Sequence, residues 1–230
     1  STDYKVDIGM CYWKPYIKET INKIAQEGAS RVVVVTLSPF NSRISTGAYF
    51  KQAKEVLDKF GEIKKTYIKD WFKNPLYLKS VVGKINERLS EYSDKQRKQV
   101  QLIFSIHSLP VKYIEEGDPY VEEVKYVISK VTQELEISNW HIAYQSKGRS
   151  GEWLKPEIED LLERLLKEGK KEVLIVPLSF ISDHVETLYD IDIVLKNLTE
   201  AKGMSLKRVA ALNDSPMFIS ALADIITRQI

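Results

Sequence analysis

The sequence holds a single cysteine, Cys11, and no long apolar run. One cysteine excludes an intramolecular disulfide, a Cys-ligated iron–sulfur cluster and a Cys-based structural zinc site. Because disulfides belong to oxidising compartments, we expect this chain in a reducing, cytoplasmic setting. The longest apolar runs, such as residues 32–35 and 173–176, are far shorter than the roughly 20 residues that cross a bilayer. No transmembrane segment is therefore expected.

Neither sign of charge dominates the chain of 230 residues. There are 34 Lys and Arg against 32 Asp and Glu, a formal net charge of +2, and no segment concentrates basic residues, so no nucleic-acid partner is expected. A composition with 43% hydrophobic and 29% charged residues is typical of a soluble globular protein. No apolar surface signature stands out, which favours a monomer. The first residue is Ser1 and no signal peptide follows, so we expect a chain that is processed or incomplete at its front.

Short apolar segments rich in β-branched residues alternate with longer segments of helical periodicity. This alternation predicts an α/β protein with buried parallel strands. Strands are expected at residues 5–10, 31–37, 63–68, 100–106, 140–145, 172–178 and 208–212. Helices are expected at about residues 15–27, 46–60, 75–92, 119–135, 156–168, 185–198 and 216–228.

The chain matches itself when it is shifted by 141 residues. Lys14, Pro15, Ile17, Glu27 and Gly28 then fall on Lys155, Pro156, Ile158, Glu168 and Gly169, and the match continues through the next strand and loop as far as Thr46 and Thr187. We infer an internal duplication into two similar lobes, residues 1–95 and 96–230, with a cleft between them. From this duplication we expect the first lobe to lack the opening strand and helix that the second contains.

Two groups of ionisable residues follow buried strands. His107 comes directly after the strand at 100–106, and Asp183, His184 and Glu186 follow the strand at 172–178. A single histidine at a strand end would more often bond a loop backbone, but two such groups at one sheet edge favour a site. An imidazole and a carboxylate beside a helix N-terminus suit Fe²⁺, Co²⁺ or Zn²⁺. Asp190 lies four residues beyond Glu186 on the same helix face, although a solvent-facing carboxylate there is ordinary.

Other motifs give no support to different chemistry. The chain has no G-x-S-x-G nucleophile elbow, no Walker P-loop and no G-x-G-x-x-G fingerprint. The sequence from His184 to Glu186 matches the H-x-E of zinc deaminases, but their two partner cysteines are absent. Asp118 before Pro119 is interpreted as a helix cap, and His141 as a structural residue within a strand.

Four segments together resemble the ferrochelatases in order and spacing. They are Phe-Ser-Ile-His-Ser-Leu-Pro at 104–110, Gly-Asp-Pro-Tyr at 117–120, Tyr-Gln-Ser-Lys at 144–147 with Trp153, and Ser-Asp-His-Val-Glu-Thr-Leu-Tyr at 182–189. The resemblance spans essentially the whole chain. It implies two flavodoxin-like, doubly wound lobes that hold a porphyrin between them, and a lyase that inserts ferrous iron to form haem. It implies no iron–sulfur extension.

The resemblance also implies roles for individual residues. His107 corresponds to the family's active-site histidine and Glu186 to the glutamate that faces it across the porphyrin, both as catalytic and metal-contacting groups. Asp190 continues an acidic row whose next position is Val194, which cannot carry charge. The residues expected at the porphyrin are Tyr12, Trp13, Thr46, Ser146 and Trp153. At 38–42 the chain has Ser-Pro-Phe-Asn-Ser where the family usually has Tyr-Pro-Gln-Tyr-Ser, so porphyrin contacts there are expected to differ.

The chemistry of metal insertion agrees with these residue types. Two pyrrole protons must leave while the metal sheds water, and a histidine with a pKa of about 6.5 accepts a proton near neutrality. A rigid cleft that bends the macrocycle would expose its nitrogen lone pairs. Two alternatives stay open at this point: a porphyrin or haem carrier without catalysis, and a cobalt chelatase of the corrin pathway.

Overall fold

The computed structural model describes residues 4–229, which form two compact units. The first unit consists of the chain up to Trp71 together with the C-terminal residues from Asp224 onward. The second unit is Phe72–Ala223. Helix α3 (Pro75–Leu89), which we expected in the first lobe, groups with the second unit because it packs against α6 (Tyr120–Glu134). The division after residue 95 into two related lobes stays a prediction.

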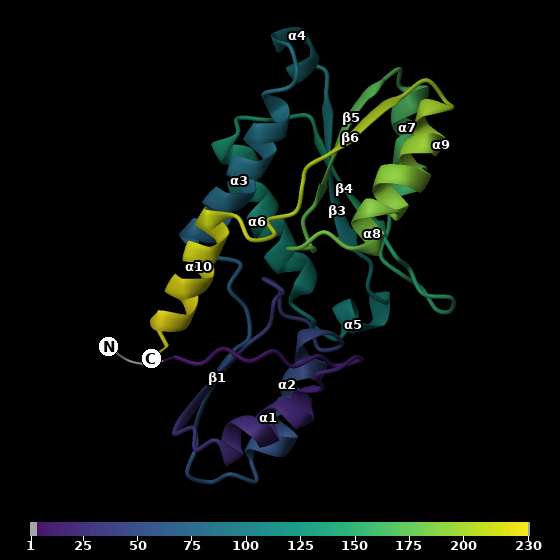
Figure 1. Cartoon of the computed structure of the whole chain (residues 1–230). Helices are drawn as coiled ribbons and strands as arrows, with labels where there is room; N and C mark the ends of the chain where they lie inside the picture. The colour runs from purple at the N-terminus through teal and green to yellow at the C-terminus, as the bar shows by residue number, and fades with distance from the viewer. Residues whose placement is uncertain (1–3, 230) are drawn as a thin grey trace. The chain divides into compact units, whose positions relative to one another are not determined.

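A four-stranded parallel sheet organises the second unit (Figure 1). Its strands are β3 (Gln101–His107), β4 (Trp140–Gln145), β5 (Glu172–Pro177) and β6 (Ser205–Arg208), in the spatial order β4-β3-β5-β6. This order is that of a flavodoxin-like sheet, in which the chain reverses direction of winding beside the first strand. Strands β3 and β5 are therefore neighbours, with Ser105 opposite Pro177, and their carboxyl ends meet at one edge.

The last strand lies earlier than the sequence predicts. We expected it at 208–212, but β6 ends at Arg208. One further ladder bond follows, from the N–H of Val209 to the carbonyl of Ile175 at 2.8 Å, and then the chain leaves the sheet. Ala211 and Leu212 are nevertheless buried. The apolar pattern there reflects burial of a loop and not strand pairing.

Helices cover both faces of this sheet. Figure 1 shows α3 and α6 on one side and α7 and α9 on the other. Besides α3 and α6, the helices of this unit are α4 (Asp94–Arg97), α5 (Val111–Glu115), α7 (Ile158–Lys167), α8 (Val185–Leu188), the π-helix η1 (Asp190–Leu195) and α9 (Lys196–Glu200). Helix α10 (Pro216–Thr227) begins in this unit, and its last residues, from Asp224, group with the first unit. The core beneath α7 and η1 joins Leu165, Ile103 and Ile191, so the apolar face of α7 sets the position of the strand ends.

Strand β3 is buried from Gln101 to Ile106, as expected for a central parallel strand covered on both faces. Only its last residue, His107, emerges to intermediate exposure. A rigid apolar strand thus ends in an ionisable side chain.

The first unit holds a shorter sheet. Strands β1 (Arg31–Val35) and β2 (Lys64–Ile68) pair in parallel beside α1 (Ile17–Gln26) and α2 (Thr46–Leu57). The prediction of a strand at residues 5–10 was wrong. Within the described residues, this segment pairs with no strand along its length and makes one isolated bridge, from Met10 to Tyr16.

Local geometry repeats at the positions that the shift of 141 superimposes. The carbonyls of Pro15 and Pro156, which the shift superimposes, each accept a backbone hydrogen bond, from the N–H of Met10 at 2.7 Å and from the N–H of Tyr144 at 2.9 Å, although these two donors do not themselves superimpose. After each following helix, Gly28 and Gly169 adopt positive φ values of 83° and 75°, where glycine ends a helix without strain. Both observations support a duplication.

Candidate active site

His107 is held on three sides at the carboxyl end of β3. Its backbone N–H donates to the Ser179 hydroxyl at 2.9 Å, and its carbonyl accepts from the Tyr120 hydroxyl at 3.2 Å. Ring Nδ1 lies 2.8 Å from the carbonyl oxygen of Ser108. A carbonyl oxygen can only accept, so Nδ1 carries the proton in this contact and Nε2 carries the lone pair. The free basic nitrogen of His107 is therefore Nε2.

The loop after β5 brings a second histidine to the same edge. The ring of Phe180 contacts His107 edge-on, with centroids 6.2 Å apart, and also contacts His184, with centroids 4.5 Å apart. Nδ1 of His184 is buried and has no hydrogen-bond partner. Phe180 thus separates two imidazoles and sets the orientation of both rings.

Glu186 lies in α8, and its carboxylate accepts a hydrogen bond from the hydroxyl of Ser146. Ser146 follows β4 directly and adopts a φ of +60°. The preceding residue, Gln145, is held by the hydroxyl of Ser105 in β3. The loops that follow β4 and β5 are therefore joined through Glu186, beside the strand that ends in His107.

Asp190 is the first residue of η1 and lines a cavity of about 390 Å³. Ser146 and Val194 line the same cavity, and Lys147 forms an ion pair across 2.6 Å with Glu157 at its wall. The hydrogen bond to Glu157 raises the pKa of Lys147. The expected acidic row is thus one carboxylate, Asp190, followed by the apolar Val194.

The helix expected at residues 185–198 is broken into α8, η1 and α9. In η1 the N–H of Val194 reaches back five residues, to the carbonyl of Tyr189 at 3.0 Å. This extra residue per turn rotates the apolar face. Ile191 and Leu195 are buried, but Leu188 and Leu198, which would share their face in a continuous α-helix, are exposed.

Trp153 is held firmly by its own loop. A Cβ built on Gly148 would lie 2.3 Å from the indole, so the ring packs directly on the glycine. The indole N–H donates to the carbonyl of Ser150 at 2.7 Å, and the N–H of Leu154 donates to the carbonyl of Leu109 at 3.0 Å. The Trp153 loop is thereby attached to the segment that follows His107.

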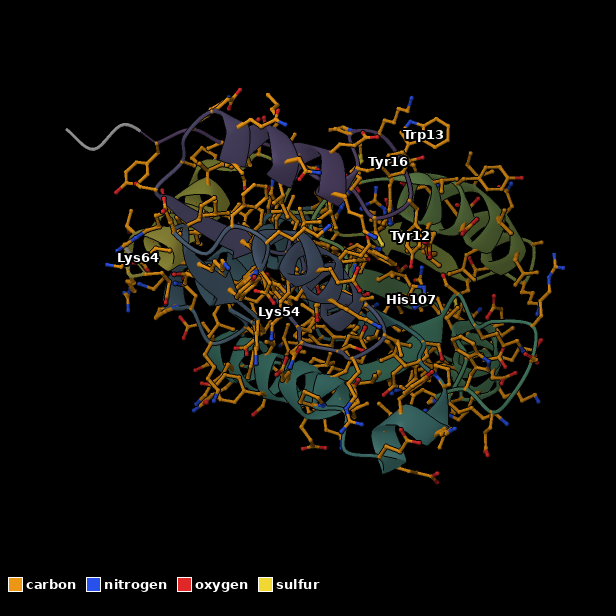
Figure 2. All side chains as sticks on the ribbon, turned by 90° about the horizontal axis from the view of Figure 1, so that it is seen from below. Tyr12, Trp13, Tyr16, Lys54, Lys64 and His107 are labelled. Atoms are coloured by element: carbon orange, nitrogen blue, oxygen red, sulfur yellow. The ribbon has the colours of Figure 1, made fainter. Side chains whose placement is uncertain are left out.

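Three other expected residues belong to the first unit. Tyr12 and Trp13 are 79% and 75% exposed, and their rings project from the loop before α1 (Figure 2). Thr46 is fully buried, and its hydroxyl both accepts from the N–H of Ser42 at 2.9 Å and lies 3.0 Å from the Ser42 carbonyl. Thr46 therefore holds its loop, and a contribution to a porphyrin site would be indirect.

The two residues interpreted as structural have structural contacts. The carboxylate of Asp118 accepts from the N–H of Tyr120 at 3.0 Å, which caps α6. His141 lies within β4, with Nε2 3.1 Å from the side-chain oxygen of Gln101. Within residues 4–229, no three His, Cys, Asp or Glu side chains come close enough together to hold a metal ion.

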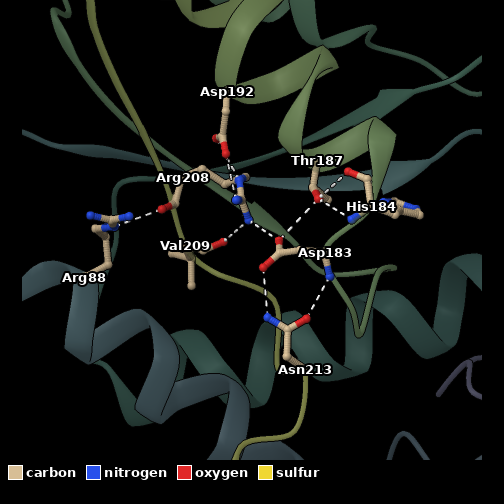
Figure 3. A network of polar contacts seen from close by, with 8 residues as sticks. All are labelled: Arg88, Asp183, His184, Thr187, Asp192, Arg208, Val209 and Asn213. Atoms are coloured by element: carbon tan, nitrogen blue, oxygen red, sulfur yellow. Dashed lines mark hydrogen bonds and ion pairs between the residues drawn. The ribbon is translucent and has the colours of Figure 1, made fainter.

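Sequence reasoning missed a polar network behind the site. Arg208, the last residue of β6, binds both Asp183 and Asp192 (Figure 3). The hydrogen bond from Asn213 and the charge of Arg208 outweigh burial and keep the pKa of Asp183 below its usual value. The only signal in the sequence was the pair of aspartates flanking Glu186, which does not identify their partner.

A family model for ferrochelatase matches residues 1–230. The chain belongs to the ferrochelatase family. It is 40% identical to a ferrochelatase of Geotalea daltonii over 227 residues, which cover 97% of this chain and 70% of that protein. It is 39% identical to a ferrochelatase of Herpetosiphon aurantiacus, covering 98% of this chain and 75% of that protein. As a ferrochelatase the chain is a lyase of haem biosynthesis.

Solved chelatase structures share the fold. SirB from Bacillus subtilis with Fe³⁺ superposes with a TM-score of 0.67 at 12% identity, covering 94% of this ferrochelatase chain and 77% of SirB. The cobalt complex of the sirohydrochlorin chelatase SirB from Bacillus subtilis subspecies spizizenii gives a TM-score of 0.64 at 10% identity, with 94% and 76% covered. The predicted flavodoxin-like α/β class is confirmed. None of the helices in the described part of the chain has the length and apolar character that spanning a bilayer requires.

Proposed function

We propose that this ferrochelatase inserts ferrous iron into a porphyrin, with His107 as the base on one face of the macrocycle and Glu186 on the other. The observation that carries the proposal is the shared sheet edge: His107 ends β3, and Glu186 follows the neighbouring strand β5. Family membership supports the reaction, and this arrangement supports the assignment of residues.

His107 suits the removal of pyrrole protons. The Ser108 carbonyl, 2.8 Å from Nδ1, selects the tautomer that leaves Nε2 as the acceptor. A fixed tautomer spares the enzyme a ring flip before each turnover. The ring of Phe180 restrains the imidazole from the side. His107 therefore accepts a proton through Nε2 while the metal enters.

Glu186 suits the handling of the metal. Glu186 is half-buried, and among the described residues its carboxylate accepts a hydrogen bond from one hydroxyl, that of Ser146, so oxygen lone pairs remain for a hydrated dication. Carboxylate and imidazole are ligands that accept Fe²⁺ and exchange with water. Asp190 supplies a second carboxylate on the adjoining cavity. Because Val194 is apolar, delivery of the metal along η1 depends on Asp190 alone.

Aromatic side chains supply flat surfaces for the macrocycle. The indole of Trp153 is fixed against Gly148, and a fixed ring loses little entropy when a ligand stacks on it. Trp13 and Tyr12 expose their rings in the first unit. Binding energy gathered on such surfaces is available to bend the porphyrin toward the geometry that accepts a metal.

Replacing His107 with alanine tests the assignment. We expect Fe²⁺ insertion to fall by at least about 100-fold, the usual contribution of a general base, while porphyrin binding and the melting temperature stay near those of the parent protein. His141→Ala is the matched control, since His141 also lies in the sheet but its side chain contacts the side-chain oxygen of Gln101. Turnover of H107A equal to that of H141A would refute the role of His107.

The same assay separates the alternatives. A carrier would bind porphyrin without inserting Fe²⁺ in the same sample, and a cobalt chelatase would favour Co²⁺ when the two metals compete. We expect insertion, with Fe²⁺ as the substrate metal.

A further inference from the structure

One guanidinium ties together two separate elements behind the candidate site (Figure 3). Arg208 is only 9% exposed. Its Nη1 donates to Asp183 Oδ1 at 2.6 Å, and its Nε and Nη2 donate to the two carboxylate oxygens of Asp192 at 2.8 Å each. Asp183 lies just before α8, and Asp192 lies within η1. The segment between these two anchors carries both Glu186 and Asp190.

Asp183 is fixed from further directions. Nδ2 of Asn213 donates to its Oδ2 at 2.9 Å, and the Thr187 hydroxyl donates to its Oδ1 at 3.2 Å. The backbone N–H of Asp183 donates to the side-chain oxygen of Asn213 at 2.8 Å. Thr187 in turn caps the backbone of His184 at 3.0 Å. The start of α8 therefore has little freedom to shift while Arg208 is in place.

The element between the anchors needs such restraint. Glu186 itself is half-buried, and within the described part of the chain its carboxylate has one hydrogen-bond partner, the Ser146 hydroxyl. The π-helix that follows has one extra residue in its turn, a geometry with poorer intrinsic stability than an α-helix. Reactive groups hold their positions when buried polar partners lock the elements that carry them. Arg208 is the one side chain in Figure 3 that contacts both flanks.

We propose that Arg208 is a positioning residue for metal insertion, which fixes the carboxylate of Glu186 by clamping Asp183 to Asp192. This inference rests on the proposed role of Glu186. It assigns Asp192 a function although its side chain points to Arg208 and away from the reacting groups. It also explains the two aspartates without making them metal ligands.

Asp192→Asn is the main test, because it weakens one arm of the clamp and leaves the pairing of Arg208 with Asp183. We expect kcat for Fe²⁺ insertion to fall by about 10-fold, at the lower end of the effect of groups that orient a metal ligand, with KM for porphyrin unchanged. Arg208→Met removes both arms and is expected to cost up to about 100-fold. Arg88→Met is the matched control: Arg88 donates to the backbone carbonyl of Arg208 at 2.9 Å but touches neither aspartate, so it should leave kcat unchanged.

A double-mutant cycle distinguishes positioning from a general loss of structure. In Glu186→Asp the carboxylate is already displaced by one methylene, so Asp192→Asn should add less than about 2-fold on that background. If the two losses multiply, or if D192N retains the parent kcat, the clamp is refuted. Glu186→Gln measured alone tests the proposed function separately, since full activity of E186Q would overturn the role of Glu186 whatever the cycle shows.

Discussion

Gly148→Ala displaces the Trp153 ring without changing the chemistry of that ring. The backbone φ of Gly148 lies outside the left-handed region, so alanine fits the chain, but its Cβ would lie 2.3 Å from one carbon of the indole. Carbon atoms pack at about 3.5–4.0 Å, so the ring must move by more than about 1 Å. The hydrogen bond of 2.7 Å from the indole to Ser150 would then be lost.

The expected magnitude follows from these two effects. Overpacking lowers the free energy of unfolding by about 1–3 kcal/mol. The lost hydrogen bond accounts for about 1 kcal/mol of this loss and is not added to it. For a chain of this size each kcal/mol lowers the melting temperature by about 2–4 °C. A displacement of about 1 Å in a residue that orients substrate lowers turnover by up to about 100-fold. We therefore expect weaker porphyrin binding and slower Fe²⁺ insertion.

Thermal unfolding by circular dichroism and porphyrin titration by fluorescence measure both effects. Gly83→Ala is the matched control: nothing lies within 4 Å of a Cβ at Gly83 in α3, and alanine is the better helix former by about 1 kcal/mol, so G83A should melt slightly higher and bind porphyrin normally. An unchanged melting temperature in G148A would refute the tight packing of Trp153. A lowered melting temperature with normal porphyrin affinity would remove Trp153 from the binding surface.

Two further predictions concern stability. Burial and, to a lesser extent, the charge of Arg164 lower the pKa of His141 from its usual value of 6.5. The unfolded chain therefore binds a proton at this histidine more readily than the folded protein does. As a result, this histidine lowers the free energy of unfolding as the pH falls below about 6.5. In His141→Gln, which can still bond Gln101 but cannot titrate, the melting temperature should fall less between pH 7 and 5.5, and parallel curves for the two proteins would contradict the argument. Leu165→Ala in α7 removes a fully buried side chain and should cost about 2–5 kcal/mol in urea unfolding, whereas a loss below 1 kcal/mol would mean that α7 does not form the core described.

The position of His107 was predictable because its signal is local. An apolar strand of β-branched residues ends at a single point, and the next side chain must emerge at the sheet edge. Glu186 was predictable for the same reason from β5. The strand expected at residues 5–10 was wrong because its pattern contains no information about whether a partner strand is present.

Arg208 and the π turn were not predictable from one sequence. Arg208 meets Asp192 and Asp183 across 16 and 25 residues, and no spacing rule connects the end of one strand to two other elements. Asp190 and Val194 have the spacing of an ordinary α-helix, so the extra residue in η1 is set by tertiary packing of Ile191 and Leu195 and not by local propensity.

In the proposed mechanism His107 and Glu186 act on opposite faces of one porphyrin. A crystal structure of the protein with a bound porphyrin would give the distances from the centre of the four pyrrole nitrogens to Nε2 of His107 and to the carboxylate of Glu186. We predict one group on each face, both within reach of the centre directly or through one water molecule. A porphyrin bound with both groups on the same face, or with packed protein between either group and the ring, would rule out this mechanism.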